Sequence, residues 1–248
     1  MSKVLILADL HLDLWMQKHR NPFDDLELEN AELLIIAGDL ANKPKIRWRP
    51  ALQLIGQHVD LDRVHIIPGN HDYYDFRLDG DDRLADLAHE AGAHLAQKRV
   101  ITHERTRFLC VTLWTDFALG PGSVAEKSSR SDWVMNDYRY IRVAGSGYRK
   151  ARPADTIAKH HEHLDWLRGQ LATPFEGETV VVTHHAPHPA ALPPGAPLPW
   201  CYASDLTALI EEYQPEKWLF GHTHHAAEFQ VGCTQLKNVS KGYPNEHS

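Results

Sequence analysis

Five short, mostly apolar runs, each followed directly by a cluster of Asp, Asn or His, constrain the fold of this chain more than any other feature. The runs cover residues 4–8, 33–37, 64–67, 179–182 and 217–220. Runs of this length without polar alternation are typical of strands that are buried on both faces of a sheet. Stretches with helical character lie between several of them, which is the rhythm of a largely parallel sheet. The sequence therefore predicts an α/β fold.

The polar clusters that follow these runs predict one site. They are Asp9-Leu10-His11, Gly38-Asp39, Gly69-Asn70-His71-Asp72, His184-His185 and Gly221-His222-Thr223-His224. A lone D-x-H or H-x-H is usually incidental, but in open α/β sheets ligands bind outside the carboxyl ends of the strands. A spacing of two along an extended segment places Asp9 on the same side as His11, and His222 on the same side as His224. We expect all five clusters to meet at one edge.

The remaining elements are less regular. We expect strands over 99–102 and 108–113, a hairpin that ends at Val239, and helices over 48–59, 156–171 and 204–213, the last capped by Ser204. Residues 116–155 lose periodicity and predict a long loop insertion. Residues 187–199 hold six of the fifteen prolines and form either a plain surface loop or a wall or lid of the site. With no linker or repeat in the sequence, we expect residues 1–248 to form a single domain.

Composition narrows the kind of protein. The chain has eighteen histidines and only three cysteines, which are too scattered for a disulfide framework or a cysteine zinc site. A net charge of −7 argues against a broad electrostatic grip on nucleic acid. Residues 4–8 are too short for the apolar core of a secretory signal, and no run approaches the length of a membrane span. We therefore expect a cytoplasmic protein that does not bind membranes.

The residue types indicate which metals the site could hold. Carboxylates, imidazoles and one carboxamide, with no thiolate, form a mixed oxygen and nitrogen set that suits Mn²⁺, Fe, Zn²⁺, Co²⁺ or Ni²⁺. Seven candidate ligands are too many for one ion, but they divide into two sets of four if one carboxylate bridges. Glycines before Asp39, Asn70 and His222 let the backbone bring these side chains close to the ions.

These five motifs, in this order, resemble the pattern of the calcineurin-like metallophosphoesterase superfamily, and of its small single-domain bacterial-type members in particular. The resemblance spans residues 9–224. It implies an α/β sandwich of two mixed β-sheets flanked by helices, with the metal site at the C-terminal ends of the strands. It also implies two ligand sets that share Asp39: Asp9, His11, Asp39 and His224 for one ion, and Asp39, Asn70, His184 and His222 for the other. The final stretch, residues 238–243, departs from the Asn-Pro-Arg-Gly-Tyr form of those relatives.

The same resemblance implies a mechanism. A hydroxide that bridges the two ions would attack phosphorus, and Mn²⁺ is the ion we favour for activity. His71 belongs to neither ligand set and resembles the general acid of the family, which protonates the leaving group. Asp72 either orients His71 or is a plain turn residue.

Other residues are candidates for substrate contacts. His185 lies beside a ligand and could line the pocket, and Trp133, Tyr138 and Arg139 of the insertion could stack on a base or hold a phosphate. The alternative for these three is that they pin the long loop to the core. His160, His161 and His163 do not share one helix face, which favours a solvated surface over a third metal site.

The sequence thus predicts a phosphodiesterase or phosphatase that acts on small phosphate esters, including nucleotide-like ones. A nuclease of the same superfamily is the first alternative, although the negative charge and the lack of a Lys/Arg stripe count against it. A non-catalytic metal-binding scaffold is the second, and the complete set of ligands with His71 counts against that.

Overall fold

The first sheet is built from the N-terminal third of the chain and is parallel throughout. The computed structural model describes residues 3–24, 26 and 28–246. The sheet has the order β1-β2-β3-β4 and consists of β1 (Val4–Leu7), β2 (Leu33–Ala37), β3 (Val64–Ile67) and β4 (His94–Leu95). The three predicted strands in this region are therefore confirmed, and their carboxyl ends lie at one edge.

The second sheet is mixed and has the order β11-β12-β10-β9-β6-β5. Its strands are β5 (Arg99–His103), β6 (Thr106–Val111), β9 (Glu178–Thr183), β10 (Lys217–Phe220), β11 (Glu228–Val231) and β12 (Thr234–Asn238). The central strands run parallel, and the hairpins β5–β6 and β11–β12 add the antiparallel pairs. The predicted two-sheet α/β architecture is confirmed, except that only this sheet is mixed.

The period-two pattern of the strands explains why the two sheets pack together. In β2, Ile35 packs into an apolar layer that also contains Phe108 and Val182 of the other sheet. Its neighbours Leu34 and Ile36 point to the opposite face and join the cluster beneath the helices. Because both faces are covered, every residue of β2 is buried, as the unbroken apolar run predicts.

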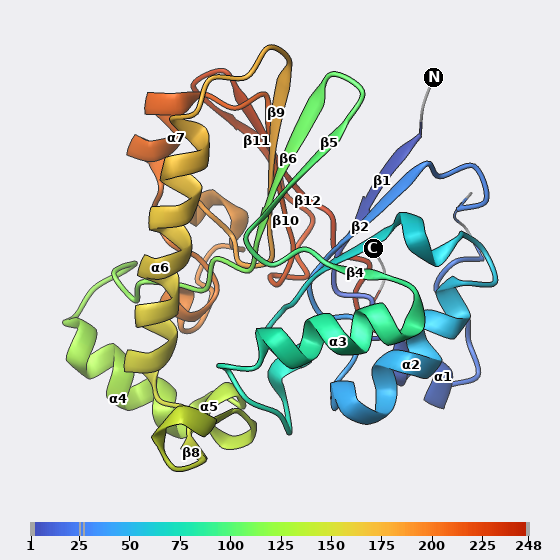
Figure 1. The fold of residues 1–248 in the computed structure, drawn as a ribbon. Helices are drawn as coiled ribbons and strands as arrows, with labels where there is room; N and C mark the ends of the chain where they lie inside the picture. The colour runs from blue at the N-terminus through green and yellow to red at the C-terminus, as the bar shows by residue number, and fades with distance from the viewer. Residues whose placement is uncertain (1–2, 25, 27, 247–248) are drawn as a thin grey trace.

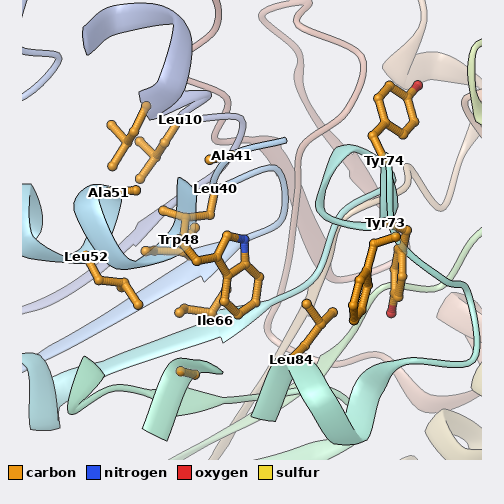
Figure 2. Close-up of a cluster of buried hydrophobic side chains, with 14 of the residues drawn as sticks. Leu10, Leu40, Ala41, Trp48, Ala51, Leu52, Ile66, Tyr73, Tyr74 and Leu84 are labelled. Atoms are coloured by element: carbon orange, nitrogen blue, oxygen red, sulfur yellow. The ribbon is translucent and has the colours of Figure 1, made fainter. Parts of the chain in front are cut away.

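Helices cover the two outer faces. Figure 1 shows α1 (Leu12–Gln17), α2 (Pro44–Ile55) and α3 (Asp81–Ala91) beside the four-stranded sheet, with α6 (Pro153–Leu171) and α7 (Thr207–Tyr213) on the opposite side of the molecule. The predicted helix over 48–59 is α2, which begins earlier because Pro44 is compatible with its first turn. In Figure 2 the Trp48 indole lies near Ile66 and Leu84, so this side chain fills the space between α2, β3 and α3.

The insertion over 116–155 is not a loop, and that prediction is wrong. It contains α4 (Val124–Val134), α5 (Asp137–Tyr140) and the small hairpin of β7 (Arg142–Val143) and β8 (Arg149–Lys150). A capping box between Ser123 and Glu126 starts α4, although few of its side chains are apolar. The helix buries Lys127 and Ser131, so hydrophobic periodicity gives no signal for it.

Two further expectations about helices are wrong. Helix α7 begins at Thr207, and the Ser204 hydroxyl donates to Asp116 Oδ1 instead of capping it. On α6, His160 and His163 are buried and only His161 is exposed. His160 Nδ1 lies 3.2 Å from the Trp114 carbonyl oxygen, so this face packs on the core and is not a solvated surface.

The proline-rich segment is held against the insertion. Trp200 is buried and its indole nitrogen donates to Ser131 Oγ of α4 at 2.9 Å. Two short 3₁₀ turns, Pro189–Ala191 and Pro199–Cys201, shape the segment. In the described part of the chain no helix has the length and apolar character to cross a bilayer.

Candidate metal centre

Five polar residues at the strand ends adopt left-handed backbone conformations. Asp9, His11, Asp39, His222 and His224 all have φ between 41° and 67°. The two-residue spacings therefore do not lie on extended segments, and this part of the prediction is wrong. Non-glycine residues persist in this region only where the surroundings hold them, and such positions cluster at functional sites. Here the His222 N–H donates to Asp9 Oδ2 at 2.8 Å, which ties β10 of one sheet to β1 of the other.

Close approach explains two of the glycines. A Cβ on Gly38 would collide with the His184 ring, and Gly38 also has φ of +95°. A Cβ on Gly69 would collide with Asp39 Oδ1. Both residues must lack a side chain so that the loops after β2 and β3 can bring their polar groups together, as the sequence predicts.

Asp39 lies at the centre of the site, with its two oxygens turned toward different histidines. Oδ2 lies 3.7 Å from His11 Nε2, and Oδ1 lies 3.5 Å from His184 Nε2. The His71 N–H donates to Oδ1 at 2.9 Å and fixes the carboxylate. This is the geometry of a carboxylate that could bridge two ions.

Candidate ligands gather on each side of Asp39. On one side, His224 Nε2 lies 3.3 Å from both Asp9 Oδ1 and His11 Nε2. On the other side, His184 Nε2 lies 3.0 Å from Asn70 Oδ1. Among the described residues, three groups of side chains have ligand atoms close enough to hold a metal ion: Asp9, His11 and His224; His11, Asp39 and His71; and Asp39, His184 and His222.

The chemistry of these donors fits divalent cations. Burial lowers the pKa of His11, His184 and His222, so their rings are neutral and carry free lone pairs. Burial, together with the charges of Asp9 and Asp72, raises the pKa of Asp39. His222 Nε2 is buried with no hydrogen-bond partner in the described structure. Such an uncompensated atom is expected where a metal binds.

His71 is held by Asn42, a residue that the sequence analysis missed. Asn42 Oδ1 lies 3.0 Å from His71 Nδ1, and Asn42 Nδ2 donates to Asp13 Oδ2 at 3.0 Å, which orients the amide. The Tyr74 ring stacks on His71 at 4.3 Å. Burial lowers the pKa of His71 to about 3, so the ring is neutral and keeps its proton on Nδ1, facing Asn42.

In the described structure the hydrogen bonds of Asp72 go to groups other than the His71 ring, whose Nδ1 faces Asn42. The Asp72 carboxylate accepts hydrogen bonds from the backbone N–H groups of Gly69, Asp39, Ala41 and Leu40 and from the Trp48 indole, at 2.8 to 3.3 Å. Asp72 is completely buried. It therefore shapes the loop that carries Asp39 and is more than a plain turn residue.

Two carboxylates from distant parts of the chain orient candidate ligands. Asp137 of the insertion accepts from Asn70 Nδ2 at 2.8 Å, which leaves Asn70 Oδ1 facing the site. Glu246 Oε2 lies 2.7 Å from His224 Nδ1. Neither residue carries a motif, so no signal in the sequence singles them out for these roles.

The residues predicted to contact the substrate do not line the cleft at the metal-ligand candidates. A cleft of about 560 Å³ opens over the metal-ligand candidates. Trp133, Tyr138 and Arg139 line a separate cavity of about 500 Å³, so the cleft lining gives that prediction no support. His185 is buried behind the site, 4.2 Å from the His222 ring centroid. The residues that do line the cleft beside the ligands are Tyr74, Arg130, Val134, Met135, Asn136, Pro197, Leu198, Tyr202, Thr223, Tyr243 and Glu246.

Comparison with known proteins agrees with this geometry. A model of the calcineurin-like phosphoesterase family matches residues 2–226. An uncharacterized protein, L509, of Acanthamoeba polyphaga mimivirus is 24% identical over 241 residues, covering 87% of this chain and 80% of the viral protein.

Solved structures share the fold. The phosphopantetheinyl hydrolase PptH of Mycobacterium tuberculosis superposes with a TM-score of 0.74 at 22% identity, covering 98% of this chain and 90% of the other. A putative 5′-nucleotidase of Staphylococcus aureus superposes with a TM-score of 0.53 at 12% identity, covering 96% of this chain and 49% of the other. The family match spans nearly the whole chain and includes every strand-end motif. This protein therefore belongs to the calcineurin-like phosphoesterase family.

Proposed function

We propose that this protein is a binuclear metal-dependent phosphoesterase that hydrolyses phosphodiester or phosphomonoester bonds. The observation that carries the proposal is the position of Asp39, whose two oxygens face His11 on one side and His184 on the other. The proposed ligands of the first ion are Asp9, His11, Asp39 and His224. Those of the second are Asp39, Asn70, His184 and His222.

The ions, with Mn²⁺ favoured over Fe, Zn²⁺, Co²⁺ and Ni²⁺, would supply Lewis acidity that activates water and neutralises phosphoryl charge. The chain itself supplies the proton for the leaving group. Asn42 accepts the His71 Nδ1 proton, so Nε2 must first take up a second proton, and the imidazolium then gives that proton to the leaving oxygen and returns to the neutral ring. General acid catalysis of this kind contributes about 10²- to 10⁴-fold.

The cleft favours small esters. Its walls combine the aromatic rings of Tyr202 and Tyr243 with the apolar side chains of Val134, Met135 and Leu198. Nucleotide-like alcohols suit such walls because a base stacks on an aromatic ring. A nuclease stays the alternative, and a non-catalytic scaffold is the weaker one.

A second candidate is hydrolysis of phosphopantetheinyl esters. It is favoured by the apolar stretch of cleft wall at Val134, Met135 and Leu198, which suits an extended chain of low polarity. It is also favoured by the full-length likeness to a phosphopantetheinyl hydrolase. A phosphopantetheinyl ester therefore belongs in the substrate panel.

The test is to strip the protein of metal, restore Mn²⁺, and compare hydrolysis of bis-p-nitrophenyl phosphate, p-nitrophenyl phosphate, a phosphopantetheinyl ester and single-stranded DNA. Hydrolysis of either small ester supports the proposal, and hydrolysis of DNA alone favours a nuclease. Two bound ions without activity on any substrate would favour the scaffold.

Two variants separate the proposed roles. Asp39→Asn should lose metal together with activity. His71→Ala should keep both ions and lose most turnover, because His71 is in neither ligand set. Metal content is read by elemental analysis after dialysis, and an empty site in His71→Ala would contradict the assignment.

A further inference from the structure

Arg130 is the single Lys or Arg side chain among the described residues that line the cleft. It lies on α4, in the insertion, and is exposed. No carboxylate of the described chain lies within 4.0 Å of its guanidinium. The cleft carboxylate Glu246 is already bound to His224 and to the Tyr243 N–H. Arg130 is therefore free to meet an anion that enters the cleft.

Lys127, on the same helix, is used to hold the fold together, and Arg130 is not used in this way. The Lys127 ammonium is buried and donates to the carbonyl oxygens of Ala118 and Gly120 at 2.9 and 2.8 Å. Both cations approach the ring of Trp200, at 5.7 Å for Lys127 and 5.9 Å for Arg130. Because Trp200 is fixed by Ser131, the Arg130 guanidinium lies over a rigid aromatic surface that limits its freedom.

The cleft that this cation and the metal-ligand candidates line also has apolar side chains in its wall. Arg130 and Val134 are one helical turn apart and occupy the same face of α4. Met135 follows Val134, and Leu198 of the proline-rich segment lines the same cleft. A ligand whose phosphate sits at the metal-ligand candidates would share the cleft with both these apolar side chains and the guanidinium.

We propose that Arg130 binds a second anionic group of the substrate, so that preferred substrates are phosphate esters with a carboxylate or phosphate on the esterified alcohol. The inference rests on the proposed function and names the substrate class for the same site. Arginine suits this role, since its planar fork binds two oxygens of either anion.

The test uses matched diesters of p-nitrophenyl phosphate whose second group is phenyl, 4-carboxyphenyl or 4-(phosphonomethyl)phenyl. With Mn²⁺ restored, the wild-type protein should hydrolyse the anionic diesters with kcat/KM about fivefold above the phenyl diester, the gain expected of a solvent-accessible ion pair. The two anionic arms distinguish a carboxylate from a phosphate preference. The advantage should lie in KM and shrink at high salt.

Three variants identify the residue responsible. Arg130→Ala should abolish the preference, so that the three diesters are hydrolysed with equal kcat/KM, and Arg130→Lys should keep part of it. Arg139→Ala is the matched control, because Arg139 is a cation of the same insertion that lines the other cavity. Equal use of all three diesters by the wild type, or a preference that survives Arg130→Ala, would overturn the inference.

A binding measurement keeps this inference separable from the proposed function. If neither these diesters nor p-nitrophenyl phosphate is hydrolysed, the proposed function is wrong. Calorimetric titration of the Mn²⁺-loaded protein with phenyl phosphate and 4-carboxyphenyl phosphate then decides the role of Arg130. Tighter binding of the carboxylate, lost in Arg130→Ala, supports it, and equal binding overturns it.

Discussion

At the scale of single residues, the residues of the motifs can be predicted from the sequence, and the residues that orient them cannot. The sequence identifies Asp39 and His71 because each lies in a glycine-containing motif that follows an apolar run. Asn42, Asp137 and Glu246 reach the site through tertiary packing, and Asp137 lies 67 positions from the Asn70 amide that it orients. Orientation by a distant carboxylate leaves no local pattern, so these partners become visible only once the chain is folded.

Glu246 is expected to set the affinity of the first ion. Its carboxylate lies 2.7 Å from His224 Nδ1 and so turns Nε2 toward the candidate ligands Asp9 and His11. Glu246→Ala should weaken the binding of one of two Mn²⁺ ions by about 10- to 100-fold, and Glu246→Gln by less, since an amide oxygen still accepts from Nδ1. Equilibrium dialysis measures both ions. Asn245→Ala is the neighbouring control, and unchanged affinity in Glu246→Ala would sink this role.

Asn42 is expected to matter for turnover and not for metal. Asn42→Ala removes the acceptor that fixes the His71 ring, so kcat should fall by roughly tenfold, within the range of a misplaced general acid. Both ions should remain, because the side-chain hydrogen bonds of Asn42 in the described structure go to His71 and Asp13, which are not proposed ligands. Steady-state kinetics with elemental analysis checks this, and loss of an ion would show that Asn42 supports the metal centre instead.

At the scale of elements, apolar runs predict strands well and polar helices poorly. The continuous run of β2 has one explanation, burial on both faces, and the structure confirms it. Helix α4 was predicted as loop because its few buried side chains are Lys127 and Ser131, which a hydrophobic pattern reads as solvent-facing. The buried histidines of α6 mislead in the same way, since their burial depends on Trp114 and its neighbours in space.

His163 is expected to make stability depend on pH. Burial lowers its pKa to about 3, and both ring nitrogens lack a hydrogen-bond partner in the described structure. The unfolded chain, with an ordinary histidine pKa, binds the proton first, so stability is lost as pH falls below about 6.5. Between pH 7 and pH 5 the unfolding free energy of the wild type should therefore fall. In His163→Leu this fall should be smaller by roughly 1–2 kcal/mol.

Urea denaturation at the two pH values measures this difference. His161→Leu on the exposed side of the same helix is the control and should follow the wild type. Parallel loss of stability in His163→Leu and wild type would show that His163 does not titrate as a buried neutral group.

Asp72 is expected to act on stability through the loops after β2 and β3. Asp72→Ala leaves four backbone N–H groups and the Trp48 indole without their acceptor, so the unfolding free energy should fall by about 3 kcal/mol or more. Asp86→Ala removes an exposed carboxylate of α3 and should change it by less than about 0.5 kcal/mol. Reduced turnover with unchanged stability in Asp72→Ala would instead favour a direct action on His71.

At the scale of the whole molecule, the site depends on both sheets. Strands β1, β2 and β3 of the parallel sheet carry the motifs of Asp9, Asp39 and Asn70, and β9 and β10 of the mixed sheet carry those of His184 and His222. The order of the strands along the chain predicts that the motifs after β1, β2 and β3 meet at one edge. It does not predict how the two sheets are placed against each other. That placement depends on long-range hydrogen bonds such as the one from the His222 N–H to Asp9 Oδ2.

Anomalous X-ray diffraction from crystals grown with Mn²⁺ tests the central claim most directly. The proposal predicts two anomalous peaks about 3.5–4 Å apart, on either side of the Asp39 carboxylate. One should be contacted by Asp9, His11 and His224, and the other by Asn70, His184 and His222. A single peak, or peaks away from Asp39, would contradict a binuclear centre.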